Sequence, residues 1–232
     1  MPADTPLLDE SKILQTLLRL RDRIDERFPN SGLGRAAAQL LAEGRETAAR
    51  VRYLGTPNWP IRIAVGTMIA AIVIVLLVIA TTVGMPAGAA GLVGTLQAVE
   101  TFINDLIFLG IAVFFLVNLE DRLKRRRALA ALHRLRSLAH VVDMHQLTKD
   151  PERISSPTPD TASSPARTLS GPELGRYLDY CSEMLSIISK LAALHVQRFS
   201  DGVTLGAVNE VETLCSGLSG KIWQKITLLD RK

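Results

Sequence analysis

The chain has 232 residues, of which 47% are hydrophobic and 22% charged, and its formal net charge is +4. A hydrophobic share of this size fits a soluble helical protein or a membrane protein. The distribution of apolar and charged residues along the chain therefore decides between the two classes. No charged residue occurs from Ile63 to Val99, which excludes this segment from the surface of a soluble domain. The basic residues gather beside the apolar segments, which indicates anionic lipid headgroups as their partner and excludes nucleic acid.

Residues 1–58 predict a cytoplasmic helical arm of two helices. Apolar residues recur at spacings of three and four from Ile13 to Phe28, as in an amphipathic helix. The Pro-Asn-Ser-Gly sequence after Phe28 ends this helix. An alanine-rich segment from Leu33 to Leu54 has good helix propensity but a narrow apolar face. We therefore expect it to lean on another helix or on the membrane surface.

Two apolar stretches within residues 59–119 predict a transmembrane hairpin, with spans at about 62–83 and 100–119. A helix of either length covers about 30 Å, the thickness of the hydrocarbon core. Trp59 precedes the first span and suits an aromatic anchor at the level of the headgroups. A short connection rich in glycine and alanine joins the two stretches.

The positions of Lys and Arg predict the topology, since positively charged flanks remain in the cytoplasm. No Lys or Arg lies between Ile63 and Leu119, whereas both flanks are rich in them. The flanking cations are Arg45, Arg50, Arg52 and Arg62 on one side and Arg122, Lys124, Arg125, Arg126, Arg127, Arg134 and Arg136 on the other. The sequence therefore predicts a multi-pass protein of a prokaryotic-type inner membrane, with both termini in the cytoplasm.

Residues 120–149 contain neither proline nor glycine and predict a basic cytoplasmic helix that continues the second span. Its apolar residues alternate by four and three, which is typical of the seam of a coiled coil or a tight bundle. The run of cations at its start is interpreted as an anchor to the inner leaflet; it consists of Lys124, Arg125, Arg126 and Arg127. Residues 150–170 are rich in Ser, Thr and Pro and predict a disordered linker.

Residues 171–232 predict a C-terminal cytoplasmic helical hairpin. Ser170 and Glu173 form the sequence pattern of a capping box, and the helix that they open runs to Phe199. A turn at Ser200–Gly202 leads into the return helix. The apolar face of this hairpin is too broad for the hairpin alone to bury, which implies a bundle or an oligomer.

One candidate metal site lies on the basic helix. His133, His140 and Asp143 fall near one helical face, and imidazole with carboxylate is a usable ligand set for zinc or a similar ion. Of these, His140 and Asp143 are the candidate ligands. Pairing of a polar face with Arg134 or Arg136 explains the same residues without a metal.

A second candidate site lies on the second span. Glu100, Asn104 and Asp105 near its outer end can form a polar ring in a symmetric oligomer, and acidic groups near lipid often line ion pathways. The alternative interpretation places them at the water interface. A hydrophobic constriction can follow below; its candidate residues are Ile111, Phe114 and Phe115.

Self-association within the membrane is the third expectation. Asn104 and Asn118 share a face with Ile111, which suits hydrogen bonding to a neighbouring helix. Gly66 and Ala70 form a small-xxx-small pair that allows close approach of two helices.

The sequence as a whole predicts an all-α membrane protein: a two-span transmembrane helical hairpin with cytoplasmic amphipathic helices and a C-terminal helical hairpin. It contains no phosphate-binding loop and no nucleophile motif, so we expect neither an enzyme nor a bound cofactor. The leading functional hypothesis is a self-associating scaffold or signalling component, with a homo-oligomer and an unknown cytoplasmic protein as partners. The alternatives are an ion-conducting channel lined by the second span and a metal-binding cytoplasmic helix.

Overall fold

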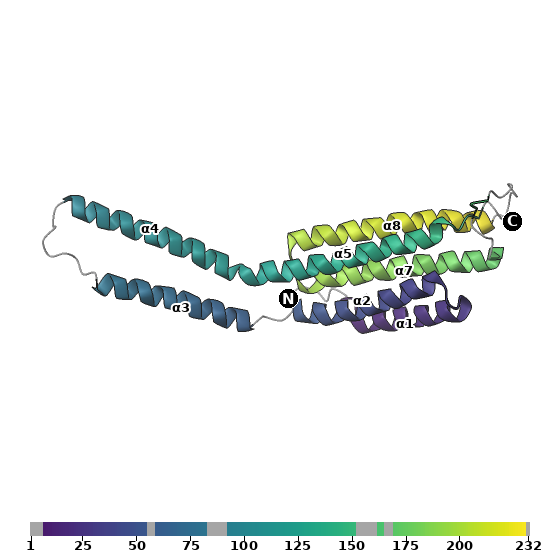
Figure 1. Ribbon diagram of the computed structural model, residues 1–232, viewed down its shortest axis with the longest axis horizontal. Helices are drawn as coiled ribbons and strands as arrows, with labels where there is room; N and C mark the ends of the chain where they lie inside the picture. The colour runs from purple at the N-terminus through teal and green to yellow at the C-terminus, as the bar shows by residue number, and fades with distance from the viewer. Residues whose placement is uncertain (1–6, 55–58, 83–91, 152–161, 165–168, 231–232) are drawn as a thin grey trace. The chain divides into compact units, whose positions relative to one another are not determined.

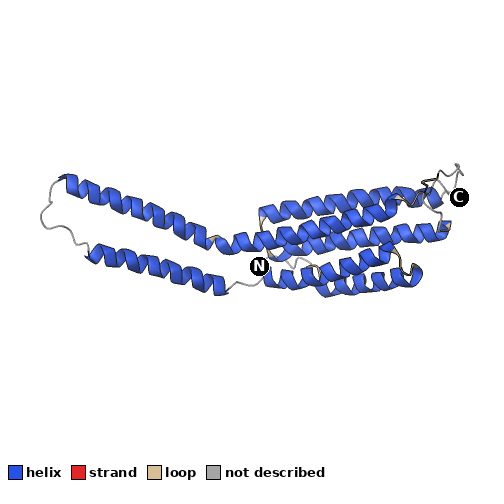
Figure 2. Ribbon diagram, viewed as in Figure 1, coloured by secondary structure: helices blue, strands red, loops and turns tan. Residues whose placement is uncertain are grey.

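All secondary structure in the described part of the chain is α-helical (Figure 2). The computed structural model describes residues 7–54, 59–82, 92–151, 162–164 and 169–230. The predicted all-α class is confirmed for these residues, and no strand occurs among them. The predicted linker at 150–170 and the connection between the two predicted spans lie mostly outside the described residues.

The chain divides into two compact units, which are described separately. The bundle unit comprises Met1–Gly55 and Arg125–Lys232, and the hairpin unit comprises Thr56–Lys124. Both segments that flank the hairpin unit in sequence therefore belong to one bundle. The helices are α1 (Glu10–Arg27), α2 (Gly32–Leu54), α3 (Trp59–Thr82), α4 (Leu92–Val117), α5 (Leu119–Leu147), α7 (Gly171–Arg198) and α8 (Gly202–Asp230) (Figure 1).

Helix α1 begins at a side-chain cap and buries one narrow face. Asp9 Oδ1 accepts hydrogen bonds from the backbone N–H groups of Ser11 (2.8 Å) and Lys12 (3.3 Å), which satisfies donors that have no partner inside the helix. Its buried residues follow the predicted spacing; they are Ile13, Leu17, Leu20 and Ile24. Asn30 has a φ of 58°, a conformation that asparagine tolerates, and it turns the chain back into α2.

Helix α2 packs against α1 and α7, in agreement with the expectation that its narrow apolar face leans on another helix. Gly44 is central to this packing. A Cβ atom at Gly44 would lie 3.2 Å from Leu14 of α1 and 3.4 Å from Leu191 of α7, so the absence of a side chain lets the three helices approach closely. The apolar residues that α2 buries are Leu33, Ala36, Ala37, Leu40, Leu41, Ala48 and Val51.

Helices α7 and α8 form the predicted C-terminal hairpin, and α7 also packs against α1 and α2. Glu173 accepts hydrogen bonds from both the backbone N–H and the hydroxyl of Ser170, so the predicted capping box is present. The broad apolar face of α7 is covered within the same chain. Its largest fully buried side chains are Leu178, Met184, Leu185, Ile188, Leu191 and Leu194.

Helix α5 runs in the same direction as α8, and polar contacts fix the register between them. Arg125 bonds Asp201, Arg136 bonds Glu210, and Lys225 Nζ donates to the backbone oxygen of Lys149 at the far end. The three pairs are separated by similar numbers of residues on both helices, as parallel helices require. The apolar face of α5 completes the bundle core with Leu132, Leu135, Ala139 and Val142 (Figure 1).

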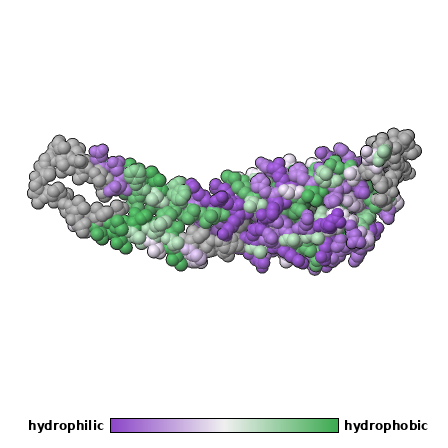
Figure 3. Space-filling model, viewed as in Figure 1, coloured by the Kyte–Doolittle hydropathy of each residue, from purple (hydrophilic) through white to green (hydrophobic). Residues whose placement is uncertain are grey.

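In the hairpin unit, α3 packs against α4, and apolar side chains cover much of the visible surface (Figures 1 and 3). Among the described residues, one helix, Ile103–Leu147, is long and apolar enough to cross a membrane by length and composition. The described apolar stretch in α3, Arg62–Val75, is shorter. The described residues therefore contain one candidate spanning helix, and both predicted spans stay predictions.

The core of the bundle unit makes a first prediction. Replacing Ile188, which has an exposed fraction of 0%, with alanine removes buried methyl groups and leaves a cavity. We expect Ile188→Ala to lower the free energy of unfolding of the bundle by about 2–5 kcal/mol. Urea unfolding of the full chain in detergent, followed by far-ultraviolet circular dichroism, measures this change.

The matched control for that substitution is Leu205→Ala, at a side chain of α8 that is 48% exposed. This control is expected to change the free energy of unfolding by less than about 0.5 kcal/mol. Equal effects of the two substitutions would contradict the described core.

Candidate functional site

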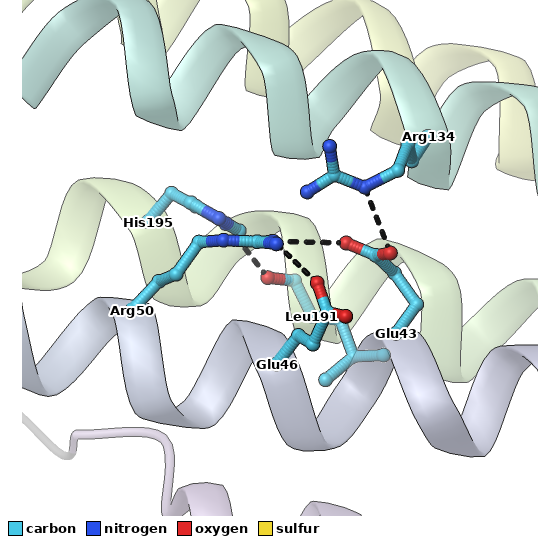
Figure 4. Close-up of polar contacts among 6 residues, drawn as sticks. All are labelled: Glu43, Glu46, Arg50, Arg134, Leu191 and His195. Atoms are coloured by element: carbon cyan, nitrogen blue, oxygen red, sulfur yellow. Dashed lines mark hydrogen bonds and ion pairs between the residues drawn. The ribbon is translucent and has the colours of Figure 1, made fainter.

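A cluster of charged side chains lies where α2, α5 and α7 meet (Figure 4). We define the Glu43 cluster as Glu43, Glu46 and Arg50 of α2 together with Arg134 of α5. The Glu43 carboxylate accepts from Arg50 Nη1 at 3.1 Å and from Arg134 Nε at 2.8 Å, and Arg50 also pairs with Glu46. One carboxylate thus holds two guanidinium groups that come from different helices.

Burial makes Glu43 the central member of this cluster. Its side chain is 10% exposed, whereas the side chains of Arg50 and Arg134 are 30% and 44% exposed. A buried carboxylate is stable in its charged form only when it is paired and hydrogen-bonded, and both of its oxygens have guanidinium partners here. The cluster therefore joins α5 to α2 through the Glu43 carboxylate. Loss of either guanidinium partner would leave a buried charge less well paired and would destabilise the bundle.

His195 of α7 lies beside the Glu43 cluster and is fully buried (Figure 4). Its Nδ1 lies 3.1 Å from the backbone oxygen of Leu191, one turn earlier in the same helix, so a proton on Nδ1 can be donated to that oxygen. Its Nε2 has no hydrogen-bond partner. The hydroxyl of Thr47, on α2 between Glu43 and Arg50, is also buried without a partner.

The surroundings of His195 favour the neutral imidazole. Burial lowers the pKa of His195 below its usual range, and the positive charge of Arg50 acts in the same direction. The backbone groups of Leu191 and Ala192 and the charge of Glu43 oppose this lowering in part. Because burial is the largest of these effects, the imidazole of His195 is neutral in the closed interface.

The candidate metal ligands lie on the outer side of α5. His140 is exposed, and Asp143 is half-buried and accepts a 2.6 Å hydrogen bond from Gln146. Arg134 and Arg136, which the sequence offered as partners for this polar face, instead bond Glu43 and Glu210. Within the described ranges no group of three or more His, Cys, Asp or Glu is placed to hold a metal ion. Metal binding at His140 and Asp143 stays a prediction.

The candidate pore and contact residues lie along α4. Asn104 and Asp105 are exposed, and Phe115 is 50% exposed with the guanidinium of Arg122 lying 4.8 Å from its ring centroid. Asn118 donates through Nδ2 to the backbone oxygen of Phe114 at 2.7 Å, so its amide bonds its own helix. A role in a pore or in contacts between copies stays a prediction for these residues.

The candidate anchoring residues lie in α3 and α5. Trp59 is 64% exposed, and Arg126 is exposed. Lys124 pairs with Glu120 at 2.8 Å, and Glu120 also accepts from Arg62, so the start of α3 is joined to the start of α5 within the hairpin unit. The remaining cations of the run are Arg125, which bonds Asp201, and Arg127, which is exposed.

Sequence reasoning missed the Glu43 cluster. The spacing of four between Glu46 and Arg50 is a detectable signal for one of its pairs. The bond from Arg134 to Glu43 joins segments on opposite sides of the predicted spans, and no local pattern predicts such a pair. No protein-family model, curated protein or solved structure matches this chain.

A second prediction tests the Glu43 cluster. Glu43→Gln keeps the shape of the side chain but removes the charge that holds Arg50 and Arg134. Because both guanidinium groups are partly solvated, we expect a loss of about 1–3 kcal/mol in the free energy of unfolding, less than for a fully buried ion pair. Urea unfolding in detergent measures this loss.

Glu210→Gln is the control for this substitution, since Glu210 and its partner Arg136 are 68% and 49% exposed. An exposed pair contributes less than about 1 kcal/mol. If Glu43→Gln cost no more than Glu210→Gln, the cluster would have no special role in joining α5 to α2.

Proposed function

We propose that the chain is an inner-membrane scaffold in which a two-span hairpin anchors a cytoplasmic helical bundle. The observation that carries this proposal is that both flanks of the hairpin unit fold into one bundle. A compact bundle lies on one side of a membrane, so the hairpin between its two parts crosses the bilayer an even number of times. If α4 spans the bilayer, α3 returns the chain across it.

The surface of the hairpin unit supports insertion into lipid. Apolar side chains that are large and exposed follow both of its helices, and such surface is costly in water. They include Ile63, Ile74, Leu77, Leu106, Phe108, Ile111 and Phe114. The absence of Lys and Arg between Ile63 and Leu119 favours a cytoplasmic location for the bundle.

The bundle needs no second copy of the chain to complete its apolar core. The wide face of α7, which implied a bundle or an oligomer from sequence alone, is covered by α1, α2 and α8 of the same chain. Self-association is therefore assigned to the hairpin unit. A Cβ atom placed on Gly66 would meet no atom within 4 Å, so the face of α3 that bears Gly66 and Ala70 is open to a second copy.

A third prediction tests the topology. A cysteine at Glu100, an exposed residue of α4, is expected to react with a membrane-impermeant maleimide added to intact cells. A cysteine at Ser137, an exposed residue of α5, is expected to react only after the membrane is permeabilised. The two native thiols are buried, so the wild-type chain gives the background. Labelling of Ser137→Cys in intact cells, or release of the chain by carbonate, would contradict the proposal.

A fourth prediction tests self-association. Gly66→Ile places a branched side chain on the open face of α3 and is expected to weaken dimerisation by about tenfold, which corresponds to about 1.4 kcal/mol. Sedimentation equilibrium of the detergent-solubilised chain measures the dissociation constant.

Met68→Ile is the control, because two residues along a helix turn a side chain to another face, and Met68 is also exposed. It is expected to leave the dissociation constant unchanged. A wild-type chain that is monomeric at every concentration would exclude the self-associating scaffold.

A further inference from the structure

We propose that His195 makes the contact between α2 and α7 sensitive to acid, so that a fall in pH opens the bundle at the end where α2 leads toward α3. The proposal rests on the position of the ring. His195 has an exposed fraction of 0%, it lies between α7 and α2, and its Nε2 is buried without a partner. A proton on Nε2 would therefore have no acceptor unless the interface separates and admits water.

The charged groups around the ring leave it no unoccupied carboxylate oxygen on Glu43. From α2, Arg50 and Glu43 act on His195 with opposite signs, and Glu46 shares Arg50 with Glu43. From α5, Arg134 occupies the second oxygen of Glu43. Both oxygens of the nearest carboxylate are therefore already taken by guanidinium groups. A positively charged imidazole would compete with Arg50 and Arg134 for one buried acceptor.

Among the described residues, the carboxylates that α1 and the start of α8 bring to this end of the bundle are already paired. At this end of the bundle, α1 contributes Glu10, which pairs with Arg52 of α2 at 3.7 Å. Asp201, which precedes α8, accepts from Arg125 and from both the backbone N–H and the hydroxyl of Thr204. Each of these carboxylates is engaged elsewhere. Opening of the interface, with hydration of the ring, is the route by which the proton is accommodated.

The sign of the pH dependence follows from linkage. Burial lowers the pKa of His195 in the closed bundle, whereas the hydrated ring of the open form has the usual value near 6.5. The open form therefore binds more protons than the closed form below about pH 6.5. The contact between α2 and α7 therefore has its full stability above about pH 6.5. It loses stability as the pH falls from there toward the lowered pKa that His195 has in the closed bundle. For one proton, the opening constant increases by up to about tenfold per pH unit in this window.

Amide hydrogen exchange of the full chain in lipid nanodiscs tests the proposal. After correction for the intrinsic exchange rate, we expect protection of Gly44–Val51 and Leu191–Arg198 to fall by about fivefold between pH 6.5 and 5.5. His195→Gln keeps a polar side chain but cannot titrate, and its protection is expected to change by less than about twofold.

Two controls separate His195 from His140 and His145. His140→Gln alters an exposed histidine of α5 and is expected to behave as the wild type. Burial also lowers the pKa of His145, but this ring lies against Gly32 at the start of α2, so His145→Gln is expected to leave the two measured segments unchanged. A wild-type protection that is flat over this range, or one that falls equally in His195→Gln, overturns the proposal.

If His195→Gln fails to fold, titration of the wild-type ring by nuclear magnetic resonance decides the question. A midpoint well below 6.5, with exchange broadening of neighbouring α2 signals, supports coupling between protonation and opening. A midpoint near 6.5 with an undisturbed interface overturns it.

Discussion

The structure depends on a single core that joins the segments on either side of the hairpin unit. Helices α1 and α2 precede the hairpin, and α5, α7 and α8 follow it, yet their apolar side chains form one cluster. Closing this core brings together the two ends of the hairpin, which constrains any insertion into a membrane to an even number of crossings. The proposed topology therefore rests on packing in the bundle as well as on the charges beside the predicted spans.

Polar contacts determine how α5 fits into that core. This helix is rich in arginine, and three of its six buried apolar residues are alanines, which bury little surface: Ala128, Ala131, Leu132, Leu135, Ala139 and Val142. Ion pairs at Asp201, Glu43 and Glu210 each hold an arginine of α5 at a different height along the bundle. The Arg134–Glu43 pair joins α5 to α2, and the side chain of Glu43 is 10% exposed. A shift of α5 by one turn would move Arg134 away from Glu43 and leave an oxygen of this carboxylate without its partner.

The sequence predicts the local elements of this fold well. The start of α7 follows from the Ser170–Glu173 capping box, and the buried face of α1 follows from apolar spacing, because these signals act within a few residues. The Asp9 cap of α1 was not predicted. The contacts of α5 with α2 could not be predicted, because Arg134 and Glu43 are far apart in sequence and either can pair equally well with nearer groups. His195 belonged to a predicted apolar face, but its unpartnered Nε2 is a property of the folded interface. The second span satisfies the length criterion over Ile103–Leu147, whereas the first falls short of it over Arg62–Val75.

The junction between α4 and α5 shows how one polar residue can adjust a long helix. Asn118 is the single residue that separates the two helices, and both its backbone N–H and its side-chain amide donate to the backbone oxygen of Phe114. A side-chain amide that competes for a helical carbonyl bends or interrupts a helix without ending it. The next turn restores the helical pattern, since the N–H of Arg122 bonds the oxygen of Asn118. Helices α4 and α5 are therefore joined through the single residue Asn118 by a nearly continuous helical backbone.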